Sequence, residues 1–110
     1  MLLINDIHLD IDSELYYSEP GTETNIRTLN KVLSEAAKIE DDSDDMPEAI
    51  LLIGDLCRHG MAADEGVPVE DTEWEAMKET MIEAITAIKT AFPTVPILPV
   101  IGNNDVMYHD

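Results

Sequence analysis

The sequence predicts an α/β fold, built as a β-α-β-α-β unit with parallel strands. Two observations carry this prediction: three short apolar runs of strand length, and two segments between them whose apolar residues recur at helical spacing. Strands that alternate with helices form parallel sheets through right-handed crossovers, with the helices packed on the sheet. The chain has 110 residues, of which 45% are apolar, so we expect one domain with one core.

The first predicted strand is the apolar run at residues 1–5, and the polar stretch that follows it up to Thr24 is predicted as a loop. Residues 25–39 have the pattern of a helix, with Thr24 or Asn25 as its N-cap. We expect this helix to bury one stripe of apolar side chains. The stripe consists of Ile26, Leu29, Val32, Leu33 and Ala36.

An acidic stretch at residues 41–45 separates this helix from the second apolar run. The EF-hand calcium loop requires Gly at its sixth position and Glu at its twelfth. Counted from Asp41, those positions hold Met46 and Leu52. The stretch is therefore predicted to be a solvated acidic loop.

The second predicted strand covers residues 49–53 and ends in Gly54 and Asp55. After a loop that contains Gly and Pro, a long amphipathic helix is predicted to begin near Thr72, and its apolar residues are expected to pack in the core. They are Trp74, Met77, Met81, Ile85, Ile88 and Phe92. Pro93 and Pro96 end this helix, and residues 97–101 form the third strand.

The charge of the chain limits its partners. Six basic and twenty-four acidic side chains give a net charge of −18, which argues against nucleic acid or an anionic membrane and favours cations. No apolar run approaches the roughly 20 residues of a membrane span, so we expect no membrane segment and no export signal in this chain. The single cysteine, Cys57, excludes an internal disulfide and is expected in the core or a loop.

Each predicted strand is followed by residues of the types that bind metals. In an open parallel sheet, the functional crevice lies beyond the carboxyl ends of the strands. Carboxylate, imidazole and amide oxygen at that edge suit two divalent ions such as zinc, manganese or iron. The residues are Asp6 and His8, then Asp55, then Asn103, Asn104 and Asp105. Each motif alone is equally typical of an ordinary turn, and their occurrence at three successive strand ends favours a metal site.

The order of these motifs resembles the opening of the calcineurin-like metallophosphoesterases, whose pattern runs D-x-H, G-D, G-N-H-[DE] and then later histidines. The segments "NDIHLD", "GDLCRHG" and "GNNDVMYHD", with Tyr16 and Tyr17, are most similar to the endopolyphosphatase branch, which is related to acid sphingomyelinases. The resemblance runs through residues 1–110 and covers about the first half of the family's catalytic domain. It therefore implies about half of a four-layer α/β sandwich, incomplete on its C-terminal side.

The resemblance also implies roles for particular residues. Asp6 and His8 would bind the first metal ion, Asp55 would bridge the two ions, and Asn103 would bind the second. Asp105 would brace the loop. The two ions, zinc, manganese or iron, would bind the phosphoryl oxygens of a phosphate-containing substrate and activate a water for attack on phosphorus.

Asn104 departs from the family pattern, which has histidine at that position. An amide donates a hydrogen bond but cannot release a proton to a leaving group. His59 and His109 lie near their motifs and are the candidates to replace that histidine, with His59 preferred as an acid or a phosphate contact. An ordinary loop role for either histidine stays open, and Arg58 is either a phosphate contact or an exposed loop arginine.

The predicted function is hydrolysis of a phosphoester or phosphoanhydride, in the manner of a polyphosphatase or phosphodiesterase. The alternative is a truncated, non-catalytic relative that serves as a binding or regulatory module. The remaining metal-binding histidines are expected after Asp110, so we expect little activity from these residues alone. An uncovered sheet edge and apolar face predict self-association. Family resemblance would fit a vacuolar, lysosomal or secreted protein, and no motif in this chain decides among them.

Overall fold

Three parallel strands form the central sheet of the computed structural model, which confirms the predicted α/β fold. They are β1 (Leu2–Asn5), β2 (Ile50–Ile53) and β4 (Ile97–Val100), in the order β1-β2-β4. The structure describes residues 1–42, 46–61, 63–64, 71–106 and 108–109. No helix in these ranges is long and apolar enough to cross a membrane.

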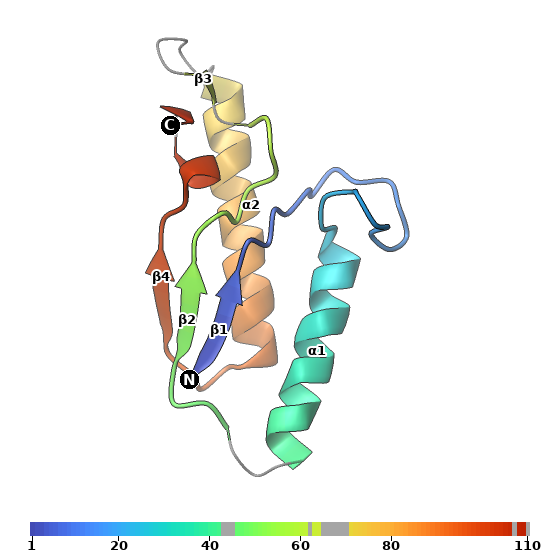
Figure 1. The fold of residues 1–110 in the computed structure, drawn as a ribbon, viewed down its shortest axis with the longest axis vertical. Helices are drawn as coiled ribbons and strands as arrows, with labels where there is room; N and C mark the ends of the chain where they lie inside the picture. Colours follow the sequence, from blue (N-terminus) through green and yellow to red (C-terminus); the bar gives the residue numbers. More distant parts are fainter. Residues whose placement is uncertain (43–45, 62, 65–70, 107, 110) are drawn as a thin grey trace.

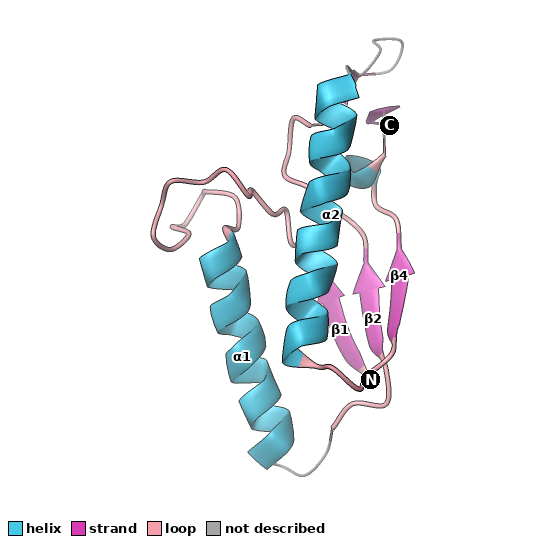
Figure 2. Ribbon diagram, turned by 180° about the vertical axis from the view of Figure 1, so that it is seen from behind, coloured by secondary structure: helices cyan, strands magenta, loops and turns pink. Residues whose placement is uncertain are grey.

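Both helices lie on the same face of the sheet. The helix α1 (Ile26–Asp42) connects β1 to β2, and α2 (Asp71–Ala91) connects β2 to β4. Because both connections are right-handed and step across the sheet in the same direction, they place both helices on one side. Figures 1 and 2 show this arrangement from the two faces of the molecule. The helices also pack against each other.

The helix α1 begins where its sequence predicts and ends later. The amide of Thr28 donates a hydrogen bond to Asn25 Oδ1 at 2.8 Å, which makes Asn25 the N-cap. The prediction of a loop at residues 41–45 is wrong for Asp41 and Asp42, which are helical, and residues 43–45 lie outside the described part of the chain. An aspartate lowers helix propensity only modestly, so an acidic stretch does not by itself end a helix.

One member of the predicted apolar stripe of α1 is not buried. Val32 is 60% exposed, whereas Leu29 and Leu33 are buried. The strand β1 is at the edge of the sheet, and α1 lies beside it. The helix α2 lies on only one side of α1 (Figure 1). The side of the stripe that faces away from α2 therefore has less protein to pack against.

The main core lies between the sheet and the two helices, and a second apolar cluster lies at the carboxyl end of β2. The second cluster contains Cys57, Met61 and Met77, with Trp74 packed against it. The predicted packing roles of Trp74, the methionines and Cys57 are therefore confirmed. The largest fully buried side chains of the main core are Phe92, Leu9, Ile50, Leu52 and Ile88.

The opposite face of the sheet is apolar and uncovered by any helix of the described chain. Register places Leu3, Leu51 and Leu98 in one row across the three strands, and Ile53 beside Val100 in the next. Leu3 and Leu98 are 57% and 50% exposed. Asn5, which pairs with Ile53, completes the second row. Neither row of this face therefore contains a charged side chain.

Hydrogen bonds to the carboxylate of Asp105 join the loops that follow β2 and β4. Its Oδ1 accepts from the amides of Leu56 at 2.7 Å and Cys57 at 2.9 Å, and its Oδ2 accepts from the amide of Gly102 at 3.1 Å. Asp105 is buried. A buried carboxylate with three amide donors fixes the two loops relative to each other.

Two glycines let these loops approach closely. Gly54 has φ of 47°, and a Cβ added to it would lie 2.6 Å from Gly102 Cα. A Cβ on Gly102 would overlap the amide nitrogen and the carboxylate of Asp55. The absence of a side chain at both positions is therefore required by the contact between the loops.

A second, two-stranded sheet was not predicted. The strands β3 (Ala63–Asp64) and β5 (Tyr108–His109) pair in parallel above the ends of the main sheet. Two residues are too few to produce a periodic pattern, so the sequence did not indicate these strands.

We expect Asp105→Asn to destabilise the protein by about 2–3 kcal/mol, because one acceptor oxygen is replaced by an amide group that faces backbone donors. Urea unfolding followed by circular dichroism measures the change. The matched control is Glu14→Gln, an exposed carboxyl-to-amide change that should stay within about 0.5 kcal/mol of wild type. Equal stabilities of the two variants would show that the Asp105 contacts contribute nothing.

We expect the chain to self-associate through the open sheet face. Light scattering across a concentration series should show a mass above that of the monomer, and Leu98→Lys should shift the protein toward monomer because it places a charge in the apolar row of that face. Ile82→Lys makes the same change at an exposed position of α2 and should not alter the mass. A wild-type monomer at high concentration would contradict the expectation.

Candidate metal centre

Three side chains of the types that bind metals meet at the carboxyl edge of the sheet. Asp6 and His8 follow β1, and Asp55 follows β2. One ligand atom from each lies within 4.8 Å of the other two. The sequence-based prediction that successive strand ends bring these residues together therefore agrees with the geometry.

The backbone at all three residues has an unusual conformation. The φ angles are 51° at Asp6, 45° at His8 and 52° at Asp55. Residues other than glycine rarely adopt positive φ, and each instance costs about 1–3 kcal/mol. Such residues concentrate at functional sites, where the surrounding structure holds them in place. All the non-glycine residues with positive φ in the described chain belong to this group.

The imidazole of His8 is oriented like that of a metal-binding histidine. Its Nδ1 lies 3.2 Å from the carbonyl oxygen of Cys57. A carbonyl only accepts hydrogen bonds, so Nδ1 carries the proton and Nε2 is left with a lone pair. Nε2 lies 3.9 Å from Asp6 Oδ1, and the side chain is only 18% exposed. A backbone carbonyl that fixes the tautomer in this way is the usual outer partner of a metal-binding histidine.

Hydrogen bonds also orient the two carboxylates. Asp55 Oδ1 accepts from the amide of Asn104 at 3.0 Å, and Asp6 Oδ2 accepts from Asn5 Nδ2 at 2.6 Å. The amide of His8 donates to the backbone oxygen of Asp55 at 2.9 Å, which joins the loop after β1 to the loop after β2. The positions of the ligands are therefore set largely by backbone contacts.

This donor set fits a divalent metal ion. Two carboxylates and one neutral imidazole are the ligands that zinc, manganese and iron share in proteins, and they neutralise the charge of the ion. The geometry around His8 supports this fit independently, since its free lone pair is on the nitrogen nearest to Asp6.

The two asparagines after β4 have different environments. They begin a short 3₁₀ helix, η1 (Asn103–Asp105). Asn103 is exposed, and its Oδ1 accepts from Asn104 Nδ2 at 3.4 Å. Asn104 is 4% exposed. The side-chain amide of Asn104 thus supports Asn103, and its backbone amide supports Asp55.

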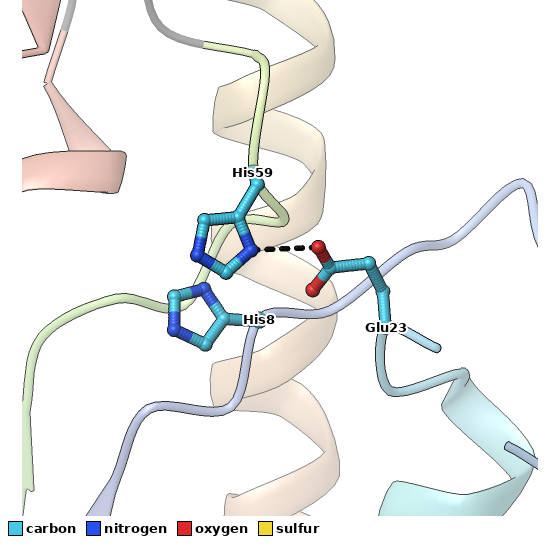
Figure 3. A group of neighbouring side chains, drawn as sticks. All are labelled: His8, Glu23 and His59. Carbon is cyan, nitrogen blue, oxygen red and sulfur yellow. Dashed lines mark hydrogen bonds and ion pairs between the residues drawn. The ribbon is translucent and has the colours of Figure 1, made fainter. Parts of the chain in front are cut away.

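His59 lies directly beside His8. The two rings are stacked with centroids 4.2 Å apart and an interplanar angle of 15°. His59 Nδ1 lies 2.7 Å from Glu23 Oε1, as Figure 3 shows. The side chain of His59 is 64% exposed, so it is open to a ligand.

Sequence reasoning missed Glu23. It precedes Thr24 in the loop between β1 and α1, and nothing in the local pattern distinguishes it from the other acidic residues of that loop. Its position depends on Leu9, which bridges to both Thr24 and Cys57. These two bridges place three distant segments side by side.

Arg58 and His109, the remaining predicted residues, are not part of the Asp6, His8 and Asp55 group. Arg58 Nε pairs with Asp10 at 3.5 Å, and its Nη1 donates to the backbone oxygen of His59 at 3.2 Å. The backbone of His109 belongs to β5, and its side chain lies outside the described part of the chain.

Cys57 is close to the site but is not suited to bind a metal. Burial, with a smaller contribution from the charge of Asp105, raises the pKa of the Cys57 thiol to about 12. The thiolate is the form that binds metals and attacks electrophiles. Cys57 therefore remains a buried thiol that packs in the second apolar cluster.

In comparisons with known proteins, the chain matches no family model and no curated protein.

Proposed function

We propose that the chain contributes the metal centre of a metal-dependent hydrolase that acts on phosphoesters or phosphoanhydrides. The observation that supports it most is the convergence of Asp6, His8 and Asp55, each at positive φ, beyond the ends of parallel strands. A strained and hydrogen-bonded cluster of this kind fits a catalytic metal site better than a solvated turn. The resemblance of the three motifs to the metallophosphoesterases supplies the reaction class.

Each residue has a role that follows from its position. Asp6, His8 and Asp55 would hold a first ion, and Asp55 and Asn103 would hold a second. When bound, the ions supply charge neutralisation for the phosphoryl group and activation of water. Asp105 keeps the loops of Asp55 and Asn103 at a fixed separation.

His59 lies beside the centre and can contact the substrate from outside the ligand set. It stacks on His8 and is exposed, whereas Asn104 is buried. A contact to the phosphoryl group or the leaving group therefore comes more readily from His59 than from the position where the family has histidine.

The acidic charge favours a substrate with few negative charges. A net charge of −18 repels a polyphosphate chain, which is a dense polyanion. A phosphodiester carries one charge per phosphate and is repelled less. Arg58, the basic side chain nearest to the centre in sequence, is already paired with Asp10.

A non-catalytic metal-binding module is the second candidate. The burial of Asn104 and its inability to release a proton favour it, because the usual source of a proton for the leaving group is then missing. Metal binding without hydrolysis of any phosphate ester would identify this function.

We expect Asp55→Ala to weaken Mn²⁺ or Zn²⁺ binding at least tenfold, because the variant removes a ligand that two loops hold in place. Isothermal titration measures affinity and stoichiometry, and circular dichroism checks that the fold is kept. For the wild type we expect micromolar or weaker binding of about one ion per chain, since three ligands from the described chain make an open site. Unchanged binding in the variant would remove Asp55 from the centre.

We expect metal-dependent hydrolysis of an aryl phosphodiester to exceed that of polyphosphate in protein that contains this chain, and Asp55→Ala to abolish both. Asp12→Ala, an exposed carboxylate of the loop after β1, is the matched control and should keep the wild-type rate. Activity that persists in Asp55→Ala would contradict the proposed reaction centre.

A further inference from the structure

We propose that Glu23 and His59 form, with His8, an alternative binding position for a divalent cation next to the Asp6–His8–Asp55 centre. One ligand atom from each of these three residues lies within 4.8 Å of the other two. Two imidazoles and one carboxylate are a donor set that zinc, iron and manganese accept. This position is called the outer position below, and the Asp6–His8–Asp55 centre is called the inner position.

The backbone holds the three residues together before any ion binds. Leu9, next to His8, bridges to Thr24 and to Cys57. The amide of Thr24 donates to the backbone oxygen of His8 at 3.1 Å, and the amide of Arg58 donates to that of Leu9 at 3.2 Å. Glu23 and His59 are the neighbours of these bonded residues, so their Cα positions are set by the folded backbone.

The side chains are arranged so that an ion can reach them. Side-chain exposure is 64% for His59 and 31% for Glu23, whereas His8 lies deeper at 18%. The outer position is therefore accessible from solvent, as is the inner position, where Asp6 is 59% exposed. Figure 3 shows the two histidine rings one above the other, with the carboxylate of Glu23 directed at His59.

The ring of His59 has to turn when the ion binds. The lone pair of an imidazole nitrogen lies in the plane of its ring, and the rings of His8 and His59 are stacked with nearly parallel planes and centroids 4.2 Å apart. An ion in the plane of one ring is therefore outside the plane of the other. His59 is the exposed member of the pair, so its ring is the one that rotates out of the stack.

The two positions share His8 and therefore exclude each other. A neutral imidazole has one lone pair. The inner position uses it on Nε2, which faces Asp6, and binding at the outer position requires His8 to turn that nitrogen away from Asp6 or to release the bond between Nδ1 and the carbonyl of Cys57. His8 can consequently serve one ion at a time. The inference deepens the proposed function, because it assigns a second cation position that uses a ligand of the same centre.

The test is Zn²⁺ titration of four proteins: wild type, Asp55→Asn, Glu23→Gln and the double variant. We expect Asp55→Asn to bind one Zn²⁺ ion with reduced affinity. In NMR spectra of this variant, the bound Zn²⁺ should shift the His59 Cε1–H resonance. We expect Glu23→Gln in the Asp55→Asn background to weaken that remaining binding by about tenfold or more. Glu19→Gln, an exposed change in the same loop, is the matched control and should have no effect.

The outcomes separate the two proposals. Loss of all binding in Asp55→Asn, or equal affinities of Asp55→Asn and the double variant, would overturn the outer position and leave the inner one intact. Binding that is insensitive to Asp55→Asn but lost in Glu23→Gln would support the outer position and overturn the proposed metal centre. Circular dichroism of each variant checks that the fold is kept. We expect it to be kept in Glu23→Gln, because the Glu23 side chain is partly exposed.

Discussion

The structure at the carboxyl edge of the sheet depends on the hydrogen bonds that the carboxylate of Asp105 accepts. This carboxylate comes from the loop after β4 and accepts hydrogen bonds from two amides of the loop after β2. Without it, the two loops would keep the bond from the backbone amide of Asn104 to Asp55 Oδ1 but would lose both hydrogen bonds that Asp105 accepts across them. Asp55 and Asn103 lie on these two loops, so this buried side chain helps to set the distance between them.

The same edge contains the strained residues of the chain. Asp6, His8 and Asp55 have positive φ, a conformation that hydrogen bonds between the loops maintain. The amide of His8 bonds to the oxygen of Asp55, and the carboxylate of Asp55 bonds to the amide of Asn104. Each loop therefore supports the next, and the strain at the ligands is balanced by contacts that only form when all three strands are paired.

His8 connects the two groups of ligand-type residues. It faces Asp6 through Nε2 and stacks on His59 with its ring. The bond from Nδ1 to Cys57 ties its orientation to the buried cluster beneath the site. Packing in that cluster, ring orientation and ligand availability are thus linked at one residue.

The sequence by itself determined the α/β class, the three strands and the convergence of Asp6, His8 and Asp55. These follow from local periodicity and from the rule that the ends of parallel strands meet at one edge. Val32 and Asp42 were predicted incorrectly because exposure and helix length depend on what lies opposite each residue. Periodicity does not contain that information.

Only the tertiary structure decided which other side chains join the site. Glu23 and His59 are 36 residues apart in the chain and meet because Leu9 bridges both of their segments. The burial of Asn104 likewise depends on how the loop after β4 folds against Asp55. A strand pattern specifies where a segment ends, whereas contacts between loops arise from long-range hydrogen bonds that no local pattern encodes.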